Sequence, residues 1–278
     1  MFNLTRSKFL KQTALGLSAA LVLAACGGSE PAADDTTAPA GDAAAAGGTW
    51  TVGTEPAYPP FEAIGDGGEL EGSDIALMTA LGEQAGYEVQ FESLPFDGLI
   101  PSLQAGTIDA AISGMTITEE RAETVDFSRP YFRAGLAIAV AEDDTEIASI
   151  DDLEGKTIAV QIGTTGAEQA EGVEGAKIVT FDSAPLALQE LANGNADAVI
   201  NDGPVTLDAI ASGNVSGVKV VGELVTEEFY GIALPQDSEN TAAINDAFAE
   251  LLANGTYAEI YQKWFGVEPD TDLPETAF

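Results

Sequence analysis

The sequence of 278 residues contains no histidine, one cysteine and only ten basic residues. Without histidine there is no Ser-His-Asp or Cys-His catalysis, no histidine-ligated metal and no histidine-based pH switch. The single cysteine, Cys26, excludes an internal disulfide and a cysteine-clustered metal site. With 46 acidic residues the formal net charge is −36, which repels phosphate backbones and argues against nucleic acid. We therefore expect no metal, no cofactor and no nucleic-acid partner.

The N-terminus, residues 1–25, has the features of a secretory signal peptide. A basic stretch, residues 1–11, precedes the apolar residues 14–25, which are too few to span a bilayer. Leu23-Ala24-Ala25-Cys26 resembles a bacterial lipobox, in which the cysteine is acylated and becomes the mature N-terminus. We predict lipidation of Cys26 and anchoring to the cell membrane, at the cell surface or in the periplasm. The alternative is a short membrane anchor with an unmodified cysteine.

Residues 26–48 are predicted to be a flexible tether. They contain no aromatic and no branched aliphatic residue, so they cannot bury enough apolar area to offset the entropy lost on ordering. No later stretch is apolar and long enough to form a transmembrane helix. We expect residues 49–278 to be soluble and extracytoplasmic. Removing residues 1–25 takes away three cations and no anion, so the net charge becomes −39, which suits either solubility or a saline habitat.

From Trp50 onward, short apolar runs alternate with amphipathic segments, which is the pattern of an α/β fold with a largely parallel sheet. Gly86 and Gly106 are expected to end the first two helices. Strands are expected over residues 49–53, 87–92, 108–112, 136–140, 158–161, 177–181, 218–221 and 230–234, and helices over 73–85, 98–104, 241–253 and 257–265.

Two segments of similar sequence, 103–114 and 191–202, each join a helix end, a glycine and an Asp-Ala pair that enters a buried strand. This internal similarity predicts two lobes of similar construction. In open α/β sheets ligands bind outside the carboxyl ends of the strands, which here fall at residues 113–116 and 201–204.

The predicted boundaries give residues 49–134 to the first lobe and 135–226 to the second. Residues 227–278 return to the first lobe and end in a C-terminal tail. The chain would then cross between the lobes near Tyr131–Gly135 and near Thr226–Tyr230. Two crossings make a hinge, and a hinged cleft is suited to enclosing a small ligand.

Arg121 lies in the first turn of a short helix that Thr118 is placed to cap. A cation there opposes the helix dipole, which is explained if Arg121 binds an anion, because guanidinium matches a carboxylate in bidentate fashion. The alternative, at even odds, is an ion pair with Glu119 or Glu123, or contact with solvent alone.

Asp202 follows the buried run Ala198-Val199-Ile200 and precedes Gly203-Pro204. At the mouth of a strand, its carboxylate could accept hydrogen bonds from an ammonium group. Taken alone, the sequence favours a second role slightly, as the cap of the helix that begins near Pro204.

Two proline-stiffened loops carry Tyr58 and Phe96, which could flank a ligand side chain or simply pack beneath the loops. Gly163-Thr164-Thr165-Gly166 could hold an anion with backbone N–H groups. It lacks the lysine and the spacing of a phosphate loop, so nucleotide binding is unsupported.

Taken in order, six motifs between Trp50 and Gly266 resemble the family-3 solute-binding proteins, the polar amino-acid receptors of bacterial ABC importers. The motifs are Gly53-Thr54-Glu55 with Pro60-Phe61-Glu62, Phe96 to Leu103, Gly114 to Arg121, Asp126 to Tyr131, Gly163 to Gly166, and Asp197-Ala198-Val199. The resemblance implies a two-lobed periplasmic-binding-protein fold of type II, a venus flytrap with two hinge crossings that closes on one amino acid.

The resemblance also implies a role for each site residue. Arg121 would bind the ligand α-carboxylate, helped by Thr116 and the backbone around Thr165. Asp202 would bind the α-ammonium group, helped by the carbonyl of Gly114. The ligand side chain would lie between Tyr58 and Phe96, with Glu55 and Gln161 at its far end.

We predict from these roles a monomeric, non-enzymatic receptor that delivers a polar amino acid to an ABC transporter permease. Glutamine and arginine are favoured, and glutamate and aspartate disfavoured, because Glu55 would meet a second carboxylate. Two other classes stay open at this point. One is a dehydratase-like enzyme on the same fold, in which Glu55 or Asp202 would act as general acid or base. The other is a surface lipoprotein that senses its ligand.

Overall fold

The computed structural model describes residues 47–270 and 272–278. The predicted signal peptide, the lipidation of Cys26 and nearly all of the predicted tether lie outside the described residues. In the part of the chain that is described, no helix is both long and apolar enough to cross a membrane.

The first lobe is built on a mixed five-stranded sheet with the order β5-β1-β6-β15-β7. Strand β1 pairs in parallel with β5 and β6, whereas β15 runs antiparallel to β6 and β7. The strands are β1 (Thr49–Thr54), β5 (Glu88–Ser93), β6 (Ala110–Ala111), β7 (Val125–Phe127) and β15 (Ala233–Pro235). A small sheet of β2 (Ala57–Tyr58), β3 (Glu62–Ile64) and β4 (Leu70–Glu71) follows β1.

The second lobe has its own five-stranded sheet with the order β11-β10-β12-β9-β13. Its strands are β9 (Leu136–Ala141), β10 (Thr157–Gln161), β11 (Lys177–Phe181), β12 (Ala198–Asp202) and β13 (Val218–Val221). The first three in this order are parallel, and β9 is antiparallel to β12 and β13. Strand β12 is buried along its whole length, as expected for a sheet covered on both faces.

The helices end where the sequence predicts. Helix α1 stops at Gly86, which adopts a left-handed conformation at φ 81°, and Thr118 caps α3 by accepting the N–H of Arg121. In the first lobe the helices are α1 (Ser73–Ala85), α2 (Phe96–Gln104), α3 (Glu119–Ala122), α7 (Asn240–Asn254) and α8 (Thr256–Phe265). Those in the second lobe are α4 (Thr165–Glu171), α5 (Ala184–Ala192), α6 (Gly203–Ala211) and a short 3₁₀ helix, Ile150–Leu153.

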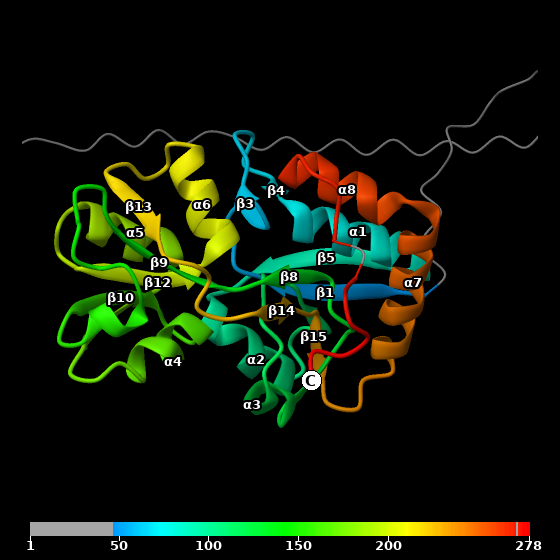
Figure 1. Ribbon diagram of the computed structural model, residues 1–278. Helices are drawn as coiled ribbons and strands as arrows, with labels where there is room; N and C mark the ends of the chain where they lie inside the picture. The colour runs from blue at the N-terminus through cyan, green and yellow to red at the C-terminus, as the bar shows by residue number, and fades with distance from the viewer. Residues whose placement is uncertain (1–46, 271) are drawn as a thin grey trace, which may run out of the picture. The chain divides into compact units, whose positions relative to one another are not determined.

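Two antiparallel strands, β8 (Phe132–Ala134) and β14 (Glu228–Tyr230), connect the two sheets as a hinge (Figure 1). This arrangement confirms the two expected crossings. The single return strand expected over residues 230–234 was wrong, because the chain forms β14 and β15 with Gly231 and Ile232 between them. Strand β14 belongs to the hinge and β15 to the first sheet, so the break lets the chain turn from one sheet into the other.

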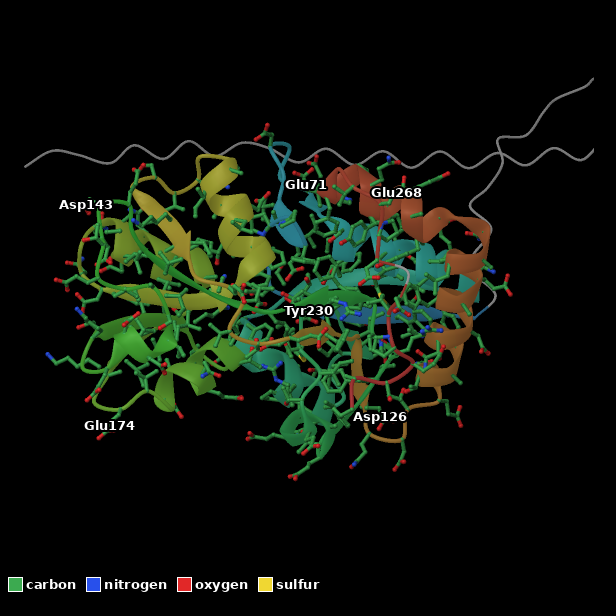
Figure 2. The ribbon with its side chains drawn as sticks, in the orientation of Figure 1. Glu71, Asp126, Asp143, Glu174, Tyr230 and Glu268 are labelled. Atoms are coloured by element: carbon green, nitrogen blue, oxygen red, sulfur yellow. The ribbon has the colours of Figure 1, made fainter. Side chains whose placement is uncertain are left out.

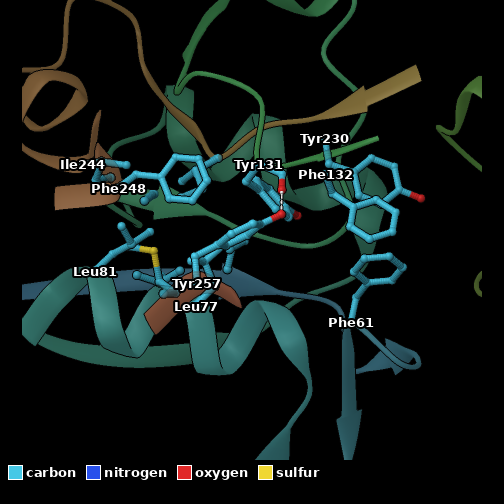
Figure 3. Close-up of a cluster of buried hydrophobic side chains, with 14 of the residues drawn as sticks. Phe61, Leu77, Leu81, Tyr131, Phe132, Tyr230, Ile244, Phe248 and Tyr257 are labelled. Carbon is cyan, nitrogen blue, oxygen red and sulfur yellow. Dashed lines mark hydrogen bonds between the residues drawn. The ribbon is translucent and has the colours of Figure 1, made fainter. Parts of the chain in front are cut away.

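The first lobe has an aromatic core that reaches the hinge (Figure 3). The ring of Phe61 packs edge-on against Phe132 of β8, at 4.9 Å, and Tyr230 of β14, at 5.2 Å. Tyr257 of α8 donates its hydroxyl over 2.6 Å to the carbonyl of Tyr131, the residue that precedes β8. The hinge strands are therefore fixed to the first lobe by ring packing as well as by backbone pairing.

Candidate functional site

A small cavity lies between the lobes, at the carboxyl ends of β6, β10 and β12. It is lined by Tyr58, Phe96, Gly114, Thr116 and Arg121 from the first lobe and by Gln161, Thr164, Thr165 and Asp202 from the second. The structure thus brings together eight of the nine expected ligand-binding residues. The ninth, Glu55, reaches the cavity through Gln161, and Thr164 was not predicted.

Arg121 is buried and places its guanidinium against the backbone of both lobes. Its Nη1 donates to the Thr116 carbonyl at 2.6 Å, and its Nη2 donates to the Gly163 carbonyl at 2.9 Å. Burial lowers the pKa of Arg121 from its ordinary value, and the negative charges of Glu168, Asp202 and Glu228 oppose that shift.

The bonds and burial of Arg121 exclude the alternative that it pairs with a neighbouring glutamate or with solvent alone. Neither Glu119 nor Glu123 forms an ion pair with it among the described residues. The guanidinium has five N–H donors, so the two carbonyl bonds leave further donors for an anion in the cavity. The Phe96 ring, 5.5 Å from the guanidinium carbon, supports the cation from another side.

Asp202 is buried at the end of β12, where its Oδ2 accepts two tyrosine hydroxyls. Tyr58 of the first lobe and Tyr230 of the hinge each donate to this oxygen at 2.5 Å. Figure 2 labels Tyr230 in the region between the lobes, and its side chain is fully buried. The side chain does not cap α6, which removes the helix-cap alternative. Burial raises the pKa of Asp202 to about 6, aided by Glu228 and opposed by the two tyrosine bonds.

Glu55 and Gln161 bond to each other across the lobes. The Gln161 side-chain amide donates to Glu55 Oε2 at 2.9 Å and to the Asp182 carbonyl at 3.3 Å. Burial raises the pKa of Glu55 to about 7, with Asp97 adding to the shift and the bond from Gln161 opposing it. The far end of the cavity is therefore acidic, and the side-chain amide of Gln161 already donates hydrogen bonds to Glu55 and to the Asp182 carbonyl.

The threonines of the cavity point their protons away from it. Thr116 and Thr165 both donate to Glu228 Oε2, at 2.6 and 3.0 Å, and Thr164 donates to the Gln161 carbonyl at 2.8 Å. Like Thr164, the hinge residues Tyr230 and Glu228 were not predicted as part of the site. Both fell in or beside an expected strand, and no local pattern distinguishes a strand residue that contacts a site.

The cavity combines a buried guanidinium from one lobe with a buried carboxylate from the other. This arrangement complements a small zwitterion, whose own carboxylate and ammonium would satisfy both charges. In residues 47–270 and 272–278 no cluster of side chains is suited to hold a metal ion.

Residues 50–267 match the family described as bacterial extracellular solute-binding proteins, family 3. The chain is 34% identical over 255 residues to a probable histidine-binding protein of Neisseria gonorrhoeae, covering 90% of this chain and 92% of that protein. It is 38% identical over 220 residues to ABC transporter arginine-binding protein 1 of Escherichia coli strain K12, covering 77% of this chain and 89% of that protein. These relatives are binding proteins, as the expectation of a non-enzymatic chain requires.

Solved structures confirm the two-lobed fold. An ancestral arginine-binding protein bound to arginine superposes with a TM-score of 0.76 at 45% identity, covering 78% of this chain and 98% of that chain. An ancestral arginine-binding protein bound to glutamine gives a TM-score of 0.74 at 46% identity, covering 79% and 98%.

Proposed function

The chain belongs to the bacterial extracellular solute-binding proteins of family 3, and we propose that it captures a polar amino acid between its lobes for an ABC importer. The observation that carries this proposal is the cavity lined by both Arg121 and Asp202. Arg121 would hold the α-carboxylate with its remaining N–H groups. Asp202 would hold the α-ammonium group, with the Gly114 carbonyl beside it.

Arginine is the ligand that we place first, with glutamine second. Above pH 7 the ionised Glu55, bonded to Gln161 at the far end of the cavity, and its neighbour Asp97 place negative charge there, which favours a guanidinium and opposes the side chain of glutamate or aspartate. Tyr58 and Phe96 offer ring faces on which a guanidinium or an amide can stack. The arginine-bound and glutamine-bound forms of the ancestral protein support the same pair of ligands.

We further propose that Cys26 is acylated after removal of residues 1–25, so that the receptor is held at the membrane near its permease. As a separate proposal, we assign residues 49–134 and 227–278 to the first lobe and residues 135–226 to the second. In the Cys26→Ser variant the chain should leave the membrane fraction while its ligand affinity stays unchanged. A serine variant that still fractionates with membranes would refute the lipid anchor.

Isothermal titration calorimetry on the full chain with the Cys26→Ser change tests the ligand. At pH 8, where Glu55 is ionised, L-arginine and L-glutamine should bind, and L-glutamate should bind at least about a hundredfold more weakly, because a second carboxylate would lie close to Glu55 in a desolvated cavity. Equal affinities for L-glutamate and L-arginine would refute the assignment of the far end. Binding of no amino acid at all would refute the proposed function.

A further inference from the structure

Glu228 is a buried carboxylate at the start of the hinge strand β14, and it does not line the cavity. Its Oε2 receives the hydroxyl of Thr116 at 2.6 Å and that of Thr165 at 3.0 Å. Its Oε1 receives the hydroxyl of Thr226 at 3.0 Å. One hinge side chain therefore collects three hydroxyls, and one of its oxygens takes a hydroxyl from each lobe.

The two threonines that donate to Oε2 lie in different lobes, Thr116 in the first and Thr165 in the second. Thr116 is fixed beside the hinge, because Ile117 donates its N–H to the Phe229 carbonyl at 2.8 Å and Gly231 donates to the Met115 carbonyl at 3.0 Å. Thr165 lies across the cavity, as the first residue of α4 in the second lobe. Separation of the lobes would leave the Thr116 bond intact and break the Thr165 bond. The bond from Thr165 is thus specific to the closed form.

A hydroxyl has one proton, and a carboxylate oxygen can only accept hydrogen bonds. With their protons directed to Glu228, Thr116 and Thr165 face the cavity with oxygen lone pairs alone. The α-carboxylate of a ligand would then take its hydrogen bonds from Arg121 and from backbone N–H groups. Help from Thr116, as the family resemblance implies, would then have to come from its backbone N–H, because its hydroxyl proton is bonded to Glu228.

The other described bonds between the lobes join residues that a ligand would contact or displace. They run from Tyr58 to Asp202 and, at 3.4 Å, to Asn201, from Tyr230 to Asp202, from Arg121 to the Gly163 carbonyl, and from Gln161 to Glu55. Thr165 lines the cavity, but its hydroxyl is directed away from it, to a hinge side chain outside the lining. This bond can persist while a ligand is bound.

We propose that Glu228 is a positioning residue that holds the lobes closed through Thr165 and so slows release of the amino acid. This role rests on the proposed function for its ligand, but the contact that performs it lies within the chain. Glu228 acts from the hinge, where a small change of angle moves the second lobe as a unit. Its effect should fall on dissociation, because the lobes must separate before the ligand can leave.

Stopped-flow kinetics with L-arginine on the full chain test the proposal through Glu228→Ala and Thr165→Val. Each change removes the same bond, and valine keeps the shape of threonine. Each should raise the dissociation rate about tenfold, since hydrogen bonds to charged groups are worth at least that factor. Association rates should stay within about twofold. Glu223→Ala and Thr180→Val, at exposed positions of the second lobe, are the matched controls and should leave both rates unchanged.

The double variant separates the proposed role from two independent contacts. If Glu228 and Thr165 act through one another, the double variant should release L-arginine no faster than the faster single variant. Multiplied effects would mean that Thr165 contacts the ligand directly, and an unchanged dissociation rate in Thr165→Val would mean that the bond does not restrain opening. Either result overturns the proposal, and the rate measured for Thr165→Val tests it even if Glu228→Ala fails to fold.

Interlobe energy transfer in the ligand-free chain separates failure of this proposal from failure of the proposed function. Dyes on cysteines placed at the exposed Glu83 and Glu174, with Cys26→Ser in the background, report lobe separation. Thr165→Val should lower the transfer efficiency relative to wild type and to Thr180→Val. Equal efficiencies would overturn the proposal. A lowered efficiency in a chain that binds no amino acid would support the closed-form contact and refute the receptor function alone.

Discussion

Asp109 precedes β6 in the first lobe, and Asp197 precedes β12 in the second, and the two make the same bonds. The Asp109 carboxylate accepts the Thr51 N–H at 2.8 Å, and the Asp197 carboxylate accepts the Thr157 N–H at 2.7 Å. Each aspartate also donates its own N–H back to the same threonine carbonyl. This double link joins neighbouring parallel strands in the same way in both lobes, and it gives a physical reason for the aspartate that residues 103–114 and 191–202 share.

Beyond this link the lobes differ in their interiors. The core of the first lobe is aromatic and continues into the hinge, where Phe61, Phe132 and Tyr230 pack together. Between residues 135 and 226 the only aromatic residue is Phe181. There the two faces of the sheet are covered by aliphatic side chains and alanine. The hinge therefore packs as part of the first lobe.

The lobes differ equally in the charge that they bring to the cavity. The first lobe contributes the cation Arg121, and the second contributes the anion Asp202. Separated lobes would leave each charge facing water, whereas joined lobes bury both in one space. A ligand that carries both charges can thus stabilise the closed form through one contact with each lobe. A zwitterion is such a ligand, because its carboxylate would contact Arg121 and its ammonium group would contact Asp202.

The largest expected effect comes from removing one of these charges. Arg121→Ala or Asp202→Ala should weaken L-arginine binding at least about thirtyfold, because loss of one partner of a desolvated charge pair costs roughly 2–5 kcal/mol. Calorimetry on each full-chain variant measures the loss. Arg129→Ala, which removes a cation outside the cavity that pairs with the exposed Glu275, is the control and should bind normally. Normal binding by either site variant would remove that lobe's charge from the site.

The sequence predicted the parts of the site that have a local cause. Arg121 became a candidate because a cation opposes the dipole of its own helix, and Asp202 because it ends a buried apolar run, but the ligand-binding roles were assigned to both only through the family resemblance. Helix α1 and strands β11 and β13 have the predicted bounds, since apolar periodicity and glycine stops define them within a few residues.

The bonds between the lobes could not be predicted in the same way. Tyr58 and Asp202 are 144 residues apart, and Thr165 and Glu228 are 63 apart. Threonine, tyrosine and glutamate are common in strands and loops, and their hydroxyl or carboxylate direction depends on how the lobes meet. Glu228 carries no local signal that separates it from its exposed neighbour Glu227.

The next largest expected effect is a dependence of stability on pH that comes from the buried carboxyl group of Glu55. Burial holds the pKa of Glu55 at about 7, above its value in the unfolded chain. The folded chain then binds an extra proton between about pH 4.5 and pH 7, so this group's stabilising contribution is complete below pH 4.5 and is lost as the pH rises through 7. Between pH 5 and pH 8, wild type should lose on the order of 2 kcal/mol more stability than Glu55→Gln.

Urea unfolding of the ligand-free chain at the two pH values measures this difference. Glu92→Gln, at an exposed position on β5, is the control and should keep the wild-type dependence, which includes the general repulsion among the acidic residues. If Glu55→Gln also keeps the wild-type dependence of stability on pH, the extra proton bound by the folded chain is not on Glu55. L-arginine affinity should change in the opposite direction, rising as Glu55 ionises above pH 7, which links the same proton to the far end of the cavity.

The smallest effect concerns the bonds that Asp109 in the first lobe and Asp197 in the second make to a threonine of the neighbouring strand. Asp109→Ala should destabilise the chain by about 1–2 kcal/mol and Asp197→Ala by about 0.5–1 kcal/mol, because Asp109 is partly buried while Asp197 is exposed and its bond competes with water. Urea unfolding measures both, and Asp143→Ala, at an exposed position of the second lobe, corrects for the relief of acidic repulsion. Equal losses would mean that burial does not set the strength of the link. No loss in either variant would mean that the strands keep their register without it, and the similarity of the two segments would then need another physical cause.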